Sequence, residues 1–215
     1  MIDFYTWPTP NGRKVSILLE ELGISYKIYP IDISIDEQFT EEFLTISPNN
    51  KIPAIFDSEK NIALMESGAI MLYLAQKYDK FIVKGDEYWH MIEWLMWQMA
   101  GLGPMLGQVH HFGKYNKGKS LYAEERYSRE AHRLYGVLNT RLSGRNFIVG
   151  DGKGEYTIAD MAIWPWISRF EWQNINLNDY IEVKRWYISI SGRSAVKRGY
   201  HAAKYISEIP IPSEE

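Results

Sequence analysis

The sequence predicts an α/β domain over residues 1–80, with the element order βαβαββα, followed by an all-α domain over residues 86–215. Two observations support this prediction. Short β-branched, aromatic or alternating runs typical of strands are interleaved with helical patterns in the first part. From Asp86 onward the strand signals stop, and apolar residues recur at helical spacing. The expected linker is Asp79 to Gly85.

The chain opens with a short strand pattern, Ile2 to Thr6, which Trp7 and Pro8 break. Thr9 before Pro10 is a good helix start, because a hydroxyl caps the first turn and proline suits it. Gly23 is a natural helix stop. Between them, apolar residues repeat at helical spacing: Val15, Leu18, Leu19 and Leu22.

Five further elements follow in the first domain: a strand at Tyr26 to Ile33, a short helix at Asp36 to Leu44, strands at Ala54–Phe56 and Ile62–Leu64, and a helix at Ser67 to Tyr78. The first βαβ unit implies a parallel strand pair with a right-handed crossover. The closing pair of strands is expected to be antiparallel. This is the strand and helix order of a thioredoxin-like fold.

The second domain contains seven of the eight tryptophans, so it must bury a large aromatic surface. Thr157 and Asp160 have the spacing of a capping box, with Asp in place of the usual Glu or Gln. The glycines from Gly101 to Gly107 lack the Lys-Ser/Thr ending of a phosphate loop and indicate a kink or a close helix approach. The expected helices are Asp86 to about Leu106, Ala123 to Leu142, Ile158 to Trp172, Ile181 to Ser191 and Ala195 to Ile206.

The composition excludes several classes of function. A net charge of −3 with mixed signs gives no basic field for nucleic acid. The absence of cysteine excludes disulfides, thiolate zinc sites and a protein-borne thiol nucleophile, and with only five histidines no metal site is expected. The start of the chain lacks a signal-peptide pattern and no apolar run reaches membrane length, which favours a soluble cytoplasmic protein.

Two short runs indicate a binding site for a small zwitterionic peptide. Pro53 pushes Ile52 into an extended conformation, and if Pro53 opens a strand, the Ile52 N–H and C=O can pair with an extended ligand. Glu66 and Ser67 fall where a strand ends and a helix begins. The helix N-terminus there would bind a carboxylate, and Glu66 would bind a neighbouring ammonium.

The chain resembles cytosolic glutathione transferases over nearly its whole length, through the Pro53 loop, the Glu66–Ser67 pair and the capping box at Thr157. Residues 9–12, 47–55, 101–108 and 125–127 are similar to the bacterial nu class, the YfcG type, which uses glutathione to reduce disulfides and conjugates model electrophiles poorly. They are also similar to the folded domain of a yeast nitrogen-regulation prion protein, which is mainly regulatory. The resemblance implies the glutathione transferase fold and a homodimer.

The resemblance also implies roles for individual residues toward glutathione. Ile52 would pair with the cysteinyl unit beside a cis Pro53, and Ser67 and Glu66 would hold the γ-glutamyl carboxylate and amine. Two residues would face the glycine carboxylate, Lys51 as a cation and Gln38 as a hydrogen-bond donor. Arg126 is a further candidate for the thiol-side opening, with an exposed helix arginine as the alternative.

The glutathione sulfur would lie near the start of the first helix, where Thr9 and Asn11 could donate hydrogen bonds to its thiolate. Helix N-termini lower thiol pKa values from about 8.5, so the thiolate fraction would rise without a protein cysteine. Tyr5 lies inside the strand pattern and is expected to pack in the domain rather than act on sulfur.

The leading hypothesis is therefore a glutathione-dependent disulfide-bond reductase with weak transferase activity. One alternative is a transferase that conjugates small electrophiles, a reading that Thr9, in place of the family's usual Tyr, Ser or Cys, makes less favourable. Another alternative is a non-catalytic binding or regulatory protein on the same fold.

Overall fold

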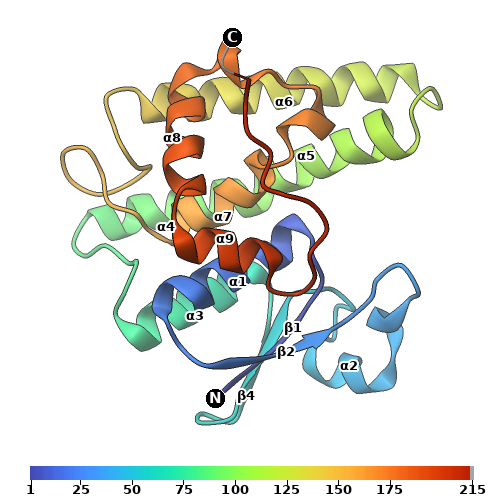
Figure 1. Ribbon diagram of the computed structural model, residues 1–215, viewed down its shortest axis with the longest axis vertical. Coiled ribbons are helices and arrows are strands. Elements are labelled where there is room, and N and C mark those ends of the chain that lie inside the picture. Colours follow the sequence, from blue (N-terminus) through green and yellow to red (C-terminus); the bar gives the residue numbers. More distant parts are fainter. Residues whose placement is uncertain (214–215) are drawn as a thin grey trace. The chain divides into compact units, whose positions relative to one another are not determined.

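The computed structural model describes residues 1–213, which form two compact groups. The first group contains residues 1–80 together with 192–209, and the second contains residues 81–191 with the segment that begins at Pro210. The first group therefore includes a C-terminal segment in addition to the residues from the predicted α/β domain. The elements of each group are labelled in Figure 1.

The first group is built on a four-stranded sheet in the order β2-β1-β3-β4. Strand β1 (Ile2–Thr6) pairs in parallel with β2 (Tyr26–Pro30) and antiparallel with β3 (Ala54–Asp57), which pairs antiparallel with β4 (Ile62–Met65). The parallel first pair and the antiparallel closing pair are as predicted. Strand β2 is shorter than the predicted Tyr26 to Ile33 because Pro30 has no N–H for the ladder and the chain then turns at Asp32.

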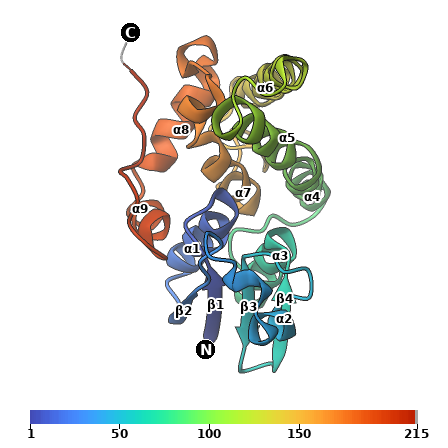
Figure 2. The same ribbon diagram turned by 90° about the vertical axis from the view of Figure 1, so that its right-hand side faces the viewer.

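Helix α1 (Pro10–Leu22) begins and ends where the sequence predicts. The Thr9 hydroxyl accepts a hydrogen bond from the Gly12 N–H at 3.2 Å, and Gly23 closes the helix with a left-handed φ of 67°. Helix α3 (Ser67–Tyr78) also has its predicted bounds. The two helices lie on one side of the sheet and α2 (Glu41–Ile46) on the other, as Figures 1 and 2 show. These helices and the sheet enclose buried apolar side chains that include Ile2, Phe4, Val15, Leu18, Ile55, Ile70 and Leu74.

The helix predicted at Asp36 to Leu44 is wrong in its bounds. A 3₁₀ turn (Glu37–Phe39) comes first, and α2 begins only after Thr40, whose hydroxyl accepts from the Phe43 N–H. The cause lies at Asp36, which has a φ of 64° and cannot form part of an α-helix.

Helix α9 (Ser194–His201) packs against α1 within the first group. The contact is close because Gly199 has no side chain, and a Cβ there would lie 2.6 Å from the Cα of Ile17. Ser16 Oγ donates to the Gly199 carbonyl at 2.6 Å, and the Arg193 guanidinium binds the Glu21 carboxylate through two hydrogen bonds. The helix ends before the predicted Ile206, where the chain turns and brings Lys204 over the ring of Trp7.

The helix predicted at Asp86 to Leu106 extends further and is not regular. It comprises α4 (Glu87–Trp97), a π-helical segment (Gln98–Leu102), α5 (Gly103–Val109) and a second π-helical segment (His110–Tyr115). Pro104 at the start of α5 cannot donate an intrahelical hydrogen bond, which accounts for the first irregularity. Gly103 and Gly107 face Trp166, so the expected close helix approach is confirmed.

The remaining helices are α6 (Leu121–Leu142), α7 (Ile158–Ile167) and α8 (Ile181–Ser191), with 3₁₀ turns at Phe170–Gln173 and Leu177–Asp179. Helix α6 starts before the predicted Ala123 because Ser120 caps it. Helix α7 ends before the predicted Trp172 because the backbone of Arg169, with φ −108° and ψ 21°, leaves the helical region.

The capping box at Thr157 is confirmed, and Asp160 does more than cap. Its carboxylate, fully buried, also accepts hydrogen bonds from Trp186 Nε1 at 2.9 Å and from the Ile148 N–H at 3.2 Å. Trp164 stacks on Tyr187 with ring centroids 5.3 Å apart. The aromatic surface predicted for this half of the chain is therefore buried largely through α7 and α8.

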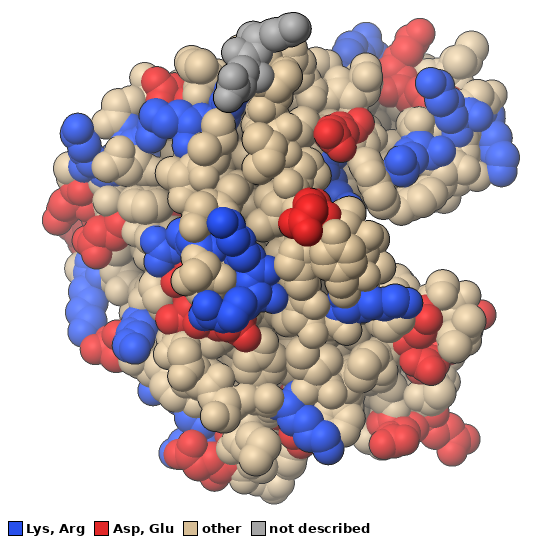
Figure 3. All heavy atoms as spheres, in the orientation of Figure 1, with Lys and Arg blue, Asp and Glu red and all other residues tan. Residues whose placement is uncertain are grey.

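Charged side chains of both signs are interspersed on the face drawn in Figure 3, in keeping with the mixed charge pattern of the sequence. Within residues 1–213, none of the helices combines the length and the apolar character needed to cross a membrane.

The close contact at Gly199 makes a prediction about stability. Gly199→Ala should destabilise the fold by ~1–3 kcal/mol, because its Cβ must displace the Ile17 backbone. Gly136→Ala on α6 is the matched control, since a Cβ there meets no atom within 4 Å and alanine is the better helix former by ~1 kcal/mol. Urea unfolding of the two variants should shift in opposite directions. A Gly199→Ala protein as stable as the parent would show that α9 does not depend on this contact.

Candidate functional site

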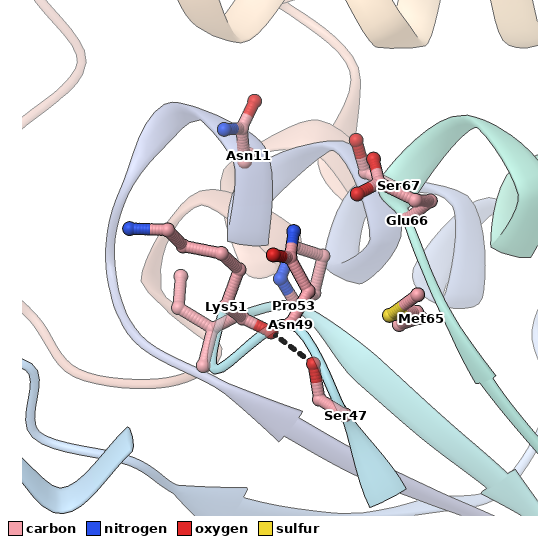
Figure 4. Close-up of a pocket in the computed structure, with 9 residues that line it drawn as sticks. Asn11, Ser47, Asn49, Lys51, Pro53, Met65, Glu66 and Ser67 are labelled. Atoms are coloured by element: carbon pink, nitrogen blue, oxygen red, sulfur yellow. Dashed lines mark hydrogen bonds between the residues drawn. The ribbon is translucent and has the colours of Figure 1, made fainter. Parts of the chain in front are cut away.

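Three segments of the first group meet at one pocket: the start of α1, the loop before β3, and the turn from β4 into α3. The lining residues are Asn11, Ser47, Asn49, Lys51, Ile52, Pro53, Met65, Glu66 and Ser67. Figure 4 shows the Lys51 ammonium on one side of the pocket and Glu66 and Ser67 on the other, with Pro53 between them. Six of the predicted site residues are therefore brought together here: Asn11, Lys51, Ile52, Pro53, Glu66 and Ser67.

The Ile52–Pro53 peptide bond is cis, as the resemblance implies. Strand β3 begins only at Ala54, so Ile52 stands just outside the ladder. Within the described part of the chain, no hydrogen bond involves the Ile52 N–H or C=O. A hydrogen bond within the loop before β3 stabilises it: Ser47 Oγ donates to the Lys51 carbonyl at 2.8 Å (Figure 4). This leaves a rigid backbone edge for an extended peptide.

Glu66 has an unusual backbone. Its φ of 68° with ψ of 113° is outside the regions that residues other than glycine commonly adopt. Although Glu66 occupies the N-cap position of α3, its side chain makes no capping hydrogen bond and is exposed beside the pocket. Ser67 is buried at the first turn of α3, where backbone N–H groups favour an anion. A group suited to an anion and a group suited to a cation thus stand next to each other.

The start of α1 forms the third wall. Asn11 lines the pocket, and Thr9, which does not, caps the same helix. Because the Thr9 hydroxyl accepts the Gly12 N–H, it has its own proton to donate to a ligand atom. Gly12 allows the first turn of α1 to pack closely against the chain that follows β1, since a Cβ there would lie 2.3 Å from the Trp7 carbonyl oxygen.

Lys14 is a residue that the sequence interpretation did not include. Its side chain is 1% exposed, and its Nζ lies 3.3 Å from Ser67 Oγ. Burial lowers the pKa of the Lys14 ammonium to about 7, an effect that the Glu66 carboxylate opposes. The signal was available: Lys14 precedes Ile17 and Leu18 by three and four residues, so it falls on the apolar face of the helix.

Besides Thr9, two predicted site residues are not in the pocket lining. Gln38 lies on the 3₁₀ turn before α2, where its amide nitrogen donates to Asp36 at 3.3 Å. Arg126 is an exposed residue of α6, in the second group, where it helps to lower the pKa of Glu130 after the larger effect of Arg133. Their roles toward a ligand stay predictions.

Tyr5 packs within the first group, as expected. Its ring stacks on Tyr29 with centroids 4.8 Å apart, and Phe43 of α2 lies 6.1 Å away. Burial, with a smaller contribution from Asp3, raises the pKa of the Tyr5 phenol. This phenol stays neutral and is not part of the pocket wall.

The arrangement can bind a small peptide by its backbone and by its charges. Ile52 offers a backbone donor and acceptor, Ser67 and the start of α3 offer an anion site, Glu66 offers a cation site, and Lys51 offers a second anion site across the pocket. Among the residues that the structure describes, no three His, Cys, Asp or Glu side chains gather as they would around a metal ion.

Known proteins are similar in sequence to this chain along most of its length. Residues 4–81 match the family described as glutathione S-transferase, N-terminal domain. The disulfide-bond oxidoreductase YfcG of Escherichia coli is 46% identical over 201 residues, which cover 91% of this chain and 92% of YfcG.

Solved structures agree with this relationship. A glutathione transferase from Burkholderia graminis, with two glutathione molecules bound per subunit, has a TM-score of 0.87 and 39% identity, covering 94% of this chain and 88% of its own. A glutathione transferase from Pseudomonas putida, with one glutathione disulfide bound per subunit, has a TM-score of 0.86 and 38% identity, covering 93% and 90%. The thioredoxin-like sheet, the helical second half and these relatives lead to one conclusion: the chain belongs to the glutathione transferase family, as a member of the YfcG type.

Proposed function

We propose that this protein is a glutathione-dependent disulfide-bond reductase of the nu class, with weak transferase activity, that works with the thiol of bound glutathione. The observation that carries the proposal is the Ile52 backbone edge standing between Lys51 and the Glu66–Ser67 pair, at the start of α1, in a chain that has no cysteine. Glutathione is a γ-Glu-Cys-Gly peptide, and its two charged ends and its central amide match these groups.

In the proposed complex each part of glutathione has a partner. Ile52 pairs with the cysteinyl amide, Ser67 and the α3 N-terminus bind the γ-glutamyl carboxylate, and Glu66 binds the adjacent amine. Lys51 and Gln38 act on the glycine carboxylate, and Arg126 is a candidate for the opening on the thiol side. The pocket, at about 160 Å³, is smaller than the ~300–1,000 Å³ that encloses a whole ligand, so part of a bound glutathione would lie outside it.

The proposed chemistry is two thiol–disulfide exchanges. Thr9 and Asn11 donate hydrogen bonds to the glutathione sulfur, which favours the thiolate, as does the α1 N-terminus. This thiolate attacks one sulfur of the substrate, forms a mixed disulfide and releases the other half as a thiolate, which takes up a proton. A second glutathione then attacks the glutathione sulfur of the mixed disulfide. The sum converts one disulfide and two glutathione molecules into two thiols and one glutathione disulfide.

This reaction requires a supply of reduced glutathione, which supports a cytoplasmic location. No metal takes part in the proposed steps, because each is an exchange between sulfur atoms. The relatives support the same proposal: YfcG carries the name of a disulfide-bond oxidoreductase, and the Burkholderia graminis structure holds two glutathione molecules per subunit.

The first test is the thiolate contact. With bis(2-hydroxyethyl) disulfide and glutathione as the sole reductant, Thr9→Ala and Asn11→Ala should each lower kcat/KM by ~10–100-fold, the value of a hydrogen bond to a charged group. Thr9→Ser is the matched control, because it keeps both the hydroxyl and the helix cap and should retain most of the activity. Unchanged rates in both alanine variants would show that these residues do not act on the sulfur.

The second test separates the proposal from its alternatives. The wild-type protein should turn over the disulfide much faster than it conjugates 1-chloro-2,4-dinitrobenzene, because the site contributes hydrogen bonds to sulfur and no further acid for an electrophile. Parallel kcat/KM measurements with both substrates decide. Fast conjugation with negligible disulfide turnover would favour a general transferase, and retention on immobilised glutathione without any turnover would favour a binding or regulatory protein.

A third test concerns assembly. We propose a homodimer, supported by the large apolar side chains that α4 exposes, Trp89 at 69% and Met96 at 45%. Sedimentation velocity at micromolar concentration should give twice the mass of the chain. A monomer across the whole micromolar range would contradict the proposal.

A further inference from the structure

A second cavity lies wholly within the second group of residues, and none of its lining residues belongs to the pocket described above. Its volume is about 500 Å³, within the ~300–1,000 Å³ typical of sites that enclose small molecules. Its walls are the second π-helical segment with the loop after it, the start of α6, and the 3₁₀ turn at Phe170–Gln173 with Asn174. The lining residues are Val109, Gly113, Lys114, Lys117, Glu124, Glu125, Ser128, Glu171, Trp172, Gln173 and Asn174.

Trp172 forms one wall of this cavity, and two cations lie against its ring. Lys114 Nζ is 4.3 Å from the ring centroid, and Arg169 Cζ is 4.6 Å from it. The rings of His110 and Tyr115 meet the same ring edge-on, with centroids 5.6 and 6.0 Å away. The π-system attracts each cation, but two like charges at one ring repel each other. An anion beside Trp172 would relieve this repulsion.

Arg169 is the more unusual of the two cations, because it is buried without an acceptor. Its side chain is 7% exposed, and its Nε is enclosed without a hydrogen-bond partner. Over residues 1–213, no ion pair or hydrogen bond involves its guanidinium. The half-buried Arg141 and Arg145 of the same group instead donate to backbone carbonyl oxygens. A buried guanidinium without an acceptor is costly, so the position favours an acceptor that comes from outside the chain.

The groups around Trp172 supply no counter-charge. Burial, followed by the charges of Arg169 and Lys114, lowers the pKa of His110 to about 4, so this imidazole is neutral at neutral pH. The carboxylates of the lining do not neutralise the cations either. Glu124 accepts the Gly118 N–H at 2.7 Å.

The other two acids of the lining, Glu125 and Glu171, form no ion pair within the part of the chain that the structure describes. Both are exposed, so water and salt screen their charges more strongly than the charge of the buried Arg169. The cavity therefore combines a cationic region at Trp172 with acids that are open to solvent.

We propose that this cavity is a binding site for a small organic carboxylate, whose charge is neutralised by Lys114 and Arg169 and whose apolar body lies against Trp172 and Val109. The proposal goes beyond the proposed function and is independent of it, because the cavity shares no residue with the pocket for glutathione.

The experiment uses isothermal titration calorimetry of the full chain in the presence of excess S-methylglutathione, which occupies the first pocket if the proposed function holds. The probes are 1-naphthoate and its neutral analogue 1-naphthalenemethanol, which differ in charge and hardly in shape. The wild-type protein should bind one 1-naphthoate per chain, and the alcohol ~10-fold more weakly. Arg169→Met should lose ~10–100-fold in affinity for 1-naphthoate, the value of interactions with a charged group, and less than about twofold for the alcohol.

Two further variants make the test specific to this cavity. Lys119→Met is the matched control, because Lys119 lies on the same loop, donates to Asn116 and is not in the lining, so its loss should leave affinity unchanged. Glu171→Gln removes an opposing charge and should strengthen binding of 1-naphthoate by ~2–5-fold, the range of an exposed charge interaction. Absence of 1-naphthoate binding at millimolar concentration, or equal losses for acid and alcohol in Arg169→Met, would overturn the inference.

The melting temperature separates binding from folding. Ligand-free Arg169→Met should melt at the same temperature as the wild type or higher, because methionine fills the space without a buried charge. If that variant does not fold, Lys114→Met decides in its place, since Lys114 is exposed and its loss should weaken 1-naphthoate and spare the alcohol. A Lys114→Met protein that binds 1-naphthoate as tightly as the wild type would then refute the site.

Discussion

One row of paired residues across the sheet holds the site together. Ala54 is paired with Tyr5 of β1 on one side and with Met65 of β4 on the other. Pro53 directly precedes Ala54, Glu66 directly follows Met65, and the chain after Tyr5 leads within a few residues to the start of α1. This single register thus brings three segments to the same end of the sheet: the loop before β3, the turn from β4 into α3, and the start of α1 (Figures 2 and 4). A slip by one residue would turn every side chain to the other face and separate the three segments.

Near this row the first group buries two cations of α1. The Lys14 ammonium is buried behind Ser67, and the Arg13 guanidinium, also buried, lies 3.5 Å over the ring of Tyr200 and donates to the Tyr200 carbonyl. The two neighbouring residues thus differ in use: Arg13 ties α1 to α9, and Lys14 faces the pocket wall. Glu66 adds a strained backbone at the same wall. A strained backbone is a cost that folds retain mainly at functional sites.

Much of the fold was predictable because its signals are local. Helix α1 begins after the hydroxyl cap of Thr9 and ends at the left-handed Gly23, and both effects act within a few residues. The capping box at Thr157 is of the same kind. The errors lie where the spacing of apolar residues does not decide. The first π-helical segment follows from Pro104, which has no N–H for the helix, and the late start of α2 follows from the left-handed backbone of Asp36. The helical spacing of apolar residues reveals neither break.

The candidate site divides in the same way. The sequence by itself determined that Ile52 is extended before Pro53, that Ser67 opens a helix and that the chain carries no thiol, because each depends on neighbouring residues or on composition. Only the tertiary structure decided that these segments share one pocket, that Lys14 lies behind Ser67 and that α9 packs on α1 through Gly199. Those facts depend on strand register and on close contacts between residues far apart in the chain. The free energy of such contacts is set by packing in three dimensions. The spacing of residues along the chain carries no information about that packing.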